Sequence, residues 1–103
     1  MKATIADIGG TDPHQRVIWY CPGCREYHGV PIPPHRQAWQ WNKNLAAPTL
    51  SPSVLVKYPG ADAGKDGAPP AVCHCFIRDG RIEFLSDCTH DHAGKTADMI
   101  VEN

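Results

Sequence analysis

A run of metal-binding residue types between Cys73 and His92 constrains this chain more than any other stretch. It reads CHCFIRDGRIEFLSDCTHDH and holds three of the five cysteines and three of the six histidines. Aromatic and branched residues flank Asp79-Gly80, and an Asp-Gly pair supplies the positive φ angles that a two-residue turn needs. The sequence therefore predicts a β-hairpin whose open end presents a cluster of soft ligands.

The predicted pairing assigns each hairpin side chain to a face. A two-residue turn pairs Ile77 with Ile82 and Cys75 with Phe84. Side chains alternate along a strand, so one set of residues shares a face. That set is Cys73, Cys75, Ile77, Ile82 and Phe84. The opposite face carries His74, Phe76 and Leu85.

Composition points to a single small domain that is mostly β. The chain has 103 residues, too few for two independent cores, and its ten prolines and nine glycines favour short strands and turns. A small α+β fold is possible, with one helix around His35–Trp41. We expect a compact zinc-stabilised β domain with a CPGC knuckle and a C-terminal β-hairpin, since a metal helps so small a core.

The domain is expected to cover residues 1–103. Residues 1–15 are polar and contain the breakers Gly9-Gly10 and Asp12-Pro13, and residues 93–103 contain few anchors, so both segments are expected to be less ordered. Residues 59–70 are rich in glycine, alanine and proline, which predicts a flexible loop between two strands.

Charge and hydropathy favour a cytoplasmic protein that binds neither nucleic acid nor membrane. The net charge is −1 and no block of like charge is long, so there is no basic footprint for nucleic acid. The N-terminus lacks the apolar core of a signal peptide, and no apolar run is long enough to span a bilayer. In the cytosol, five cysteines indicate metal binding more readily than disulfides.

The CPGC segment predicts two metal ligands, Cys21 and Cys24. The β-type run at residues 16–20 leads directly into it, which is the usual build of a zinc knuckle. The alternative is a redox dithiol, but such a pair begins a helix in a βαβ unit. No helical period follows Cys24, so we favour Zn²⁺.

Several residues compete to complete the metal site. Cys73 and His90 satisfy the strand alternation, whereas His74 is a ligand only if the hairpin turns its other face to the knuckle. The predicted ligands are thus Cys21, Cys24, Cys73, His74 and His90. The alternatives are Cys88, His28, which would give a CxxCxxxH arrangement, and Cys75, which we expect to be a core residue packed against Phe84.

Two segments, WNKNLAAPTLSPSVLV and CHCFIRDGRIEFLSDCTHDHAGKTADM, resemble a family of small phage and prophage proteins of unknown function. The similarity covers roughly residues 17–99. Some members carry an ammonia monooxygenase label, which does not suit so small a chain without an apolar span. His92 and Cys75 depart from the family pattern. The pattern positions are Trp41, Asn42, Pro48, Thr49, Ser51, Pro52, Ser53, Cys73, His74, Asp79, Gly80, Asp87, Thr89, His90 and Gly94. The resemblance implies a phage origin and action inside an infected bacterial cell.

Two functions fit these observations. The first is a non-enzymatic binding module that engages a host or phage protein, with short polar residues such as Asn42, Ser51, Ser53 and Asp87 fixing its loops. The alternative is a small zinc-dependent hydrolase with an open metal position, in which Asp87 or a histidine acts as the base. Four protein ligands would make the zinc structural, and three plus water would make it catalytic. We expect the first function, with no enzymatic activity.

Overall fold

Eight strands form two antiparallel sheets in the computed structural model, which describes residues 1–58 and 71–102. The first sheet contains β1 (Thr4–Ile8), β2 (His14–Cys21) and β3 (Glu26–Pro31), in that order. The second contains β4 (Gln40–Trp41), β5 (Leu50–Lys57), β6 (Val72–Arg78), β7 (Arg81–Phe84) and β8 (Thr96–Asp98), also in chain order. No helix occurs among these residues, and the prediction of a mostly-β domain is confirmed.

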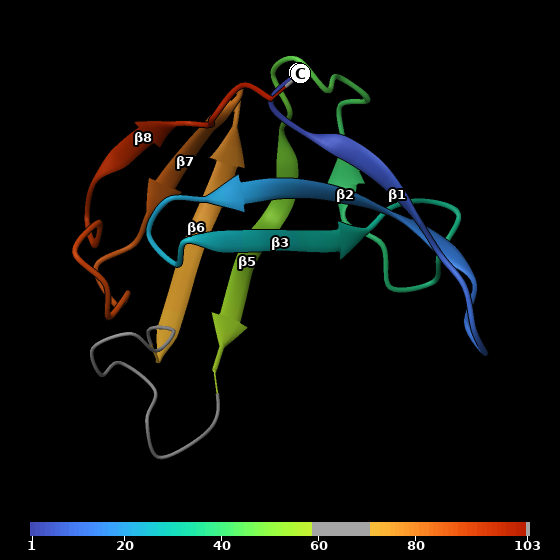
Figure 1. Ribbon diagram of the computed structural model, residues 1–103, viewed down its shortest axis with the longest axis horizontal. Coiled ribbons are helices and arrows are strands. Elements are labelled where there is room, and N and C mark those ends of the chain that lie inside the picture. Colours follow the sequence, from blue (N-terminus) through green and yellow to red (C-terminus); the bar gives the residue numbers. More distant parts are fainter. Residues whose placement is uncertain (59–70, 103) are drawn as a thin grey trace.

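The two sheets pack face to face. Strands β2 and β3 run across β5 and β6 at a wide angle (Figure 1). Alternate side chains of each strand point into the space between the layers, and these are the apolar ones. The core residues include Val17, Trp19, Val30, Leu50, Val54, Cys75, Ile77, Ile82 and Phe84. The second sheet consequently has an inner face against the first sheet and an outer face toward solvent.

The predicted hairpin is present as β6 and β7. Ile77 pairs with Ile82 and Cys75 pairs with Phe84, as the turn chemistry required. Asp79 and Gly80 have φ angles of 49° and 74°, which is the left-handed region that an Asp-Gly turn supplies. The alternation is also as predicted, because Cys73, Cys75 and Ile77 are buried and His74 and Phe76 are half-buried.

The segment around residues 35–41 forms a turn followed by β4 instead of the helix that we considered. The backbone N–H of Ala38 donates to the carbonyl of His35 at 3.2 Å, which closes a single turn. Gln40 and Trp41 then pair with Ser51 and Leu50 of β5. This short strand covers only the first two residues of β5.

Strands β1 and β8 lie within the terminal segments that we expected to be less ordered, and their relative order stays a prediction. The backbones of Met1 and Glu102 bond to each other, so the ends of the described chain meet. The predicted loop at residues 59–70 lies outside the described residues. Within residues 1–58 and 71–102, no helix has the length and apolar character needed to cross a bilayer.

Candidate active site and metal centre

Strand β6 carries two different sites on its two faces. Cys73 points inward and is fully buried, whereas the next residue, His74, points outward and its side chain is 24% exposed. Adjacent residues of a strand always face opposite ways. A polar site on the outer face and a sulfur-rich site on the inner face therefore lie back to back.

The outer site is a chain of hydrogen bonds from Ser53 through His74 to Asp87. His74 Nδ1 lies 2.9 Å from Asp87 Oδ2, and His74 Nε2 lies 3.1 Å from Ser53 Oγ. A carboxylate can only accept, so Nδ1 carries the proton and donates it to Asp87. In the neutral ring Nε2 is then an acceptor, and the Ser53 hydroxyl donates to it.

A bulge in β5 places Ser53 in this chain. The pairing of β5 with β6 jumps from Leu50↔Ile77 to Val54↔Cys75, so three residues of β5 stand opposite Phe76 alone. A bulge re-aims side chains locally. The indole N–H of Trp39 donates to the carbonyl of Pro52 at 3.0 Å, with the Ser53 carbonyl 3.4 Å away, and this contact holds the bulged backbone.

The segment that follows β7 places Asp87. Its backbone is tied along the same side of β6, because Leu85 N–H donates to the His74 carbonyl at 2.9 Å and Thr89 N–H donates to the Val72 carbonyl at 3.0 Å. The Cys88 thiol donates to the His74 carbonyl at 3.1 Å and accepts from the His74 N–H at 3.2 Å. Asp87 is itself 57% exposed, so its position comes from this backbone anchoring.

A serine, a histidine and an aspartate that are hydrogen-bonded in this order match the arrangement of nucleophile, base and orienting group in a hydrolytic triad. The distance from Ser53 to His74 and the distance from His74 to Asp87 both lie within the hydrogen-bond range that such a triad needs. Such triads are recognised by geometry and roles, because they occur on unrelated folds in different chain orders. The chain order here is Ser, His, Asp.

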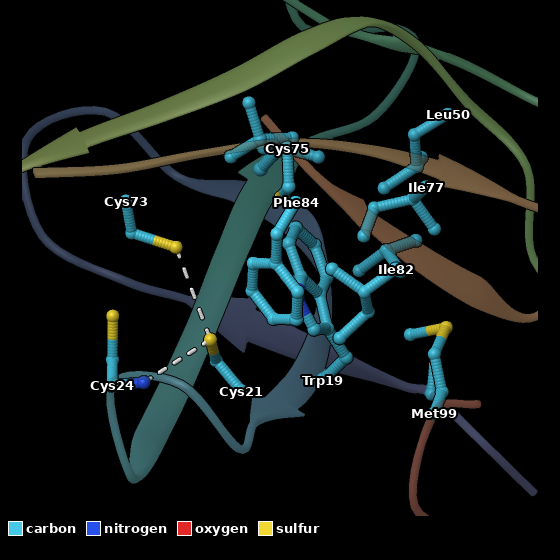
Figure 2. Packing of buried hydrophobic residues seen from close by; sticks show 14 of the residues in the cluster. Trp19, Cys21, Cys24, Leu50, Cys73, Cys75, Ile77, Ile82, Phe84 and Met99 are labelled. Carbon is cyan, nitrogen blue, oxygen red and sulfur yellow. Dashed lines mark hydrogen bonds between the residues drawn. The ribbon is translucent and has the colours of Figure 1, made fainter. Parts of the chain in front are cut away.

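The inner site brings together Cys21, Cys24, His28 and Cys73. One ligand atom from each lies within 4.8 Å of all the others, and all four residues are buried. Figure 2 shows the sulfurs of Cys21 and Cys73 facing each other, at 3.9 Å, and the Cys24 N–H donating to the Cys21 sulfur at 3.4 Å. The knuckle at the end of β2 thus meets β6 directly.

The thiols of this inner site share negative charge unevenly. Hydrogen bonding from Cys24 and Cys73 lowers the pKa of Cys21, while the same bonding to Cys21 raises the pKa of Cys24 to about 12 and also raises that of Cys73. Like charges this close oppose further ionisation. A cation among the sulfurs would reverse that balance and favour all three thiolates.

The fourth residue of the inner site fits a metal as well. His28 is 7% exposed, and its Nε2 is buried without a hydrogen-bond partner among the described residues. An unpaired buried ring nitrogen is costly unless something binds it. Three cysteines and one histidine this close together can therefore hold a metal ion with four protein ligands.

Of the other two predicted ligands, His74 lies away from the inner site, whereas His90 borders it, with a buried Nε2 that also has no hydrogen-bond partner among the described residues. His74 faces away from the sulfurs and bonds to Ser53 and Asp87. The His90 ring packs edge-on against Phe84 and lies over Gly23 of the knuckle, where an added Cβ would come within 2.5 Å of it. It forms a separate group with Cys73 and Cys88. Burial lowers the pKa of His90, which disfavours its charged form. The ligand assignments themselves stay predictions.

A family model for a bacterial ubiquitination-like system serine protease (BubE) matches residues 2–85. The match covers most of the chain, and the chain belongs to this family. No curated protein and no solved structure matches it. The expectations of a non-enzymatic binding module and of no enzymatic activity are therefore wrong, because the family is one of proteases. The hydrolase alternative fits better. The match supports a small bacterial family, while the phage origin implied by the sequence resemblance stays a prediction.

All three residues of this hydrogen-bonded chain are present in the sequence pattern, but their spacing does not show that they meet. Ser53, His74 and Asp87 all belong to the pattern of the sequence resemblance, which assigns Ser53 a loop-fixing role and Asp87 either such a role or that of a base in the hydrolase alternative. A serine, histidine and aspartate among those positions was the available signal. The position of His74 between Cys73 and Cys75 instead indicates a metal ligand, which the structure does not support because His74 faces away from the sulfurs.

Proposed function

We propose, on the premise of membership in this protease family, that the protein hydrolyses peptide or isopeptide bonds with Ser53 as the nucleophile. The observation that carries the proposal is the line of hydrogen bonds from Ser53 through His74 to Asp87, at 3.1 and 2.9 Å. The family match supports serine chemistry independently of that geometry.

Each triad member has one step to perform. Ser53 Oγ attacks the scissile carbonyl while His74 Nε2 takes its proton, and Asp87 holds the ring in the required tautomer and stabilises the imidazolium. His74 then gives that proton to the leaving amine, which yields the acyl-enzyme and the free amine. A water molecule, deprotonated by His74, attacks the ester and releases the carboxylic acid and Ser53.

The inner site has a structural role in this proposal. We propose that Cys21, Cys24, His28 and Cys73 hold Zn²⁺, because a Cys₃His set is a common structural zinc site. Four protein ligands would close the coordination sphere, so the ion would stabilise the fold and leave catalysis to the outer face.

The substrate is proposed to be a protein of a ubiquitination-like system, in keeping with the family description. From the sequence resemblance, we predict that this partner is a host or phage protein and that the enzyme acts in the bacterial cytoplasm.

Labelling with a small fluorophosphonate tests the nucleophile. Wild-type protein should form one covalent adduct, and mass spectrometry of its peptides should place it on Ser53. Ser53→Ala should lose the adduct while keeping the thermal unfolding midpoint. Ser51→Ala is the matched control, because Ser51 lies two residues away and is exposed. Labelling that survives Ser53→Ala, or that depends on Ser51, would refute the assignment.

A further inference from the structure

The side of β5 that faces away from β6 has open backbone groups beside the nucleophile. Strand β4 pairs with β5 only at Leu50 and Ser51. Among the described strands, only β4 and β6 bring Cα atoms within 8 Å of β5. No described strand therefore covers the edge of β5 from Leu55 to Lys57, while the Trp39 indole N–H lies 3.4 Å from the Ser53 carbonyl.

The pairing with β6 shows which backbone groups point outward. Leu55 stands opposite His74, but the carbonyl and N–H of His74 bond to Leu85 and Cys88 on the other side of β6. In an antiparallel pair both groups of a residue point the same way, so Leu55 and His74 form a pair without mutual hydrogen bonds. The N–H and C=O of Leu55 consequently point away from β6.

The same argument applies two residues further along. Lys57 stands opposite Val72, whose N–H and carbonyl both bond to Thr89. The N–H and C=O of Lys57 therefore also point to the open edge. The described part of the chain supplies no backbone partner for Leu55 or Lys57 on that side. Unpaired edge groups of this kind accept an added strand.

The triad fixes which part of a substrate would lie there. His74 must protonate the leaving amine, so the leaving segment lies on the β6 side of Ser53. The acyl segment then lies on the opposite side, which is the open edge of β5. Leu55 is two residues from Ser53, about 7 Å along the strand.

We infer that the substrate segment on the acyl side of the scissile bond docks as an added strand along β5, bonded to the backbone of Leu55 and Lys57. This inference rests on the proposed function. The Leu55 side chain is 49% exposed and lies on the same outer face as His74. Cross-strand neighbours on one face pack together, so the substrate carries an apolar residue opposite Leu55. The substrate class is thus an unfolded, extended segment with an apolar residue near the cleavage site.

Peptidyl diphenyl phosphonates, which phosphonylate an active serine, test this docking. A pool of pentapeptidyl phosphonates randomised in sequence reports the backbone contribution, because backbone bonds are common to all sequences. The pool should phosphonylate Ser53 faster than a single acetylated aminoalkyl phosphonate with the same reactive group. Alternate residues of an added strand donate their N–H groups to β5. N-methylation of one such residue removes one hydrogen bond and should slow phosphonylation by the pool about fivefold. N-methylation at the residues between them should have no such effect.

Side-chain preference provides the second measurement. Pools with apolar residues opposite Leu55 should react faster than polar ones, and Leu55→Asp should abolish that preference. Ile100→Asp changes another exposed apolar residue, outside the strands, and should keep it. If the small fluorophosphonate labels Ser53 but N-methylation has the same effect at every position, the docking inference is wrong and the proposed function stands. If Ser53 is not labelled at all, both fall.

Discussion

Replacing Asp87 with asparagine tests the triad without removing volume. The Asp87 carboxylate accepts the Nδ1 proton of His74 at 2.9 Å. A hydrogen bond to a charged group is worth about 1.5–3 kcal/mol. Asp87 is 57% exposed, so water screens the pair and we take the lower part of that range, about 2 kcal/mol. Since 1.36 kcal/mol is tenfold in rate, Asp87→Asn should slow acylation about 30-fold.

Two orientations of the new amide explain why the loss is moderate. If the amide presents its N–H₂ group to Nδ1, the ring takes the wrong tautomer and cannot accept the Ser53 proton, which costs about 10⁴-fold in a buried triad. Because the position is exposed, the amide can turn and present its oxygen instead. The amide oxygen then keeps a neutral hydrogen bond, so the 30-fold figure, which counts the whole bond to the carboxylate, is the upper end of the expected loss.

The assay is the second-order rate of fluorophosphonate labelling of Ser53, with the thermal unfolding midpoint measured alongside. Asp91→Asn is the matched control, because Asp91 also bonds to a histidine, His92, at 2.9 Å but is not connected to Ser53. The reasoning is refuted if Asp87→Asn slows labelling no more than Asp91→Asn does while both proteins remain folded.

Three further substitutions separate positioning from metal binding. Trp39→Phe removes the indole donor to Pro52, so labelling of Ser53 should slow severalfold, while the remaining aromatic ring keeps the unfolding midpoint within a few degrees. Cys88→Ala leaves the His74 N–H without its sulfur partner and should lower the free energy of unfolding by about 1–2 kcal/mol with metal content unchanged. Metal loss in that variant would instead make Cys88 a ligand. Cys75→Ser should also keep its metal, because Cys75 packs beside Phe84, and elemental analysis of this variant checks it.

The hairpin and its two faces could be predicted because the information is local. Asp79-Gly80 specifies the turn, the turn specifies the register, and the register assigns each side chain of β6 to a face. The same local logic identified the knuckle, since CPGC brings two sulfurs together without help from the rest of the chain.

The triad could not be predicted in this way because it depends on non-local irregularities. Ser53 reaches His74 only because β5 contains a bulge, and the residues SPSV do not indicate where along the strand a bulge forms. Asp87 follows the end of β7 and is held by contacts of Leu85 and Thr89 with β6. His28 faces the cysteines because β3 pairs with β2 in a register that opposes it to Trp19. Each of these positions is set by tertiary pairing.

The adjacency of Cys73 and His74 leads to the last prediction, that metal removal abolishes activity together with the fold. Binding free energies of structural zinc sites reach about 10–16 kcal/mol, which matches or exceeds the stability of a whole domain. The ion would bridge the β2–β3 knuckle to β6, so its loss separates the two sheets and frees the strand that carries His74.

A chelator should therefore lower the thermal unfolding midpoint and Ser53 labelling in parallel, and added Zn²⁺ should restore both. Ser53→Ala should lose labelling with no change in metal content or midpoint, since Ser53 lies on the opposite face of the sheet from the sulfurs. A chelated protein that stays folded yet fails to react would place the metal in the chemistry and contradict the division between the two faces of β6.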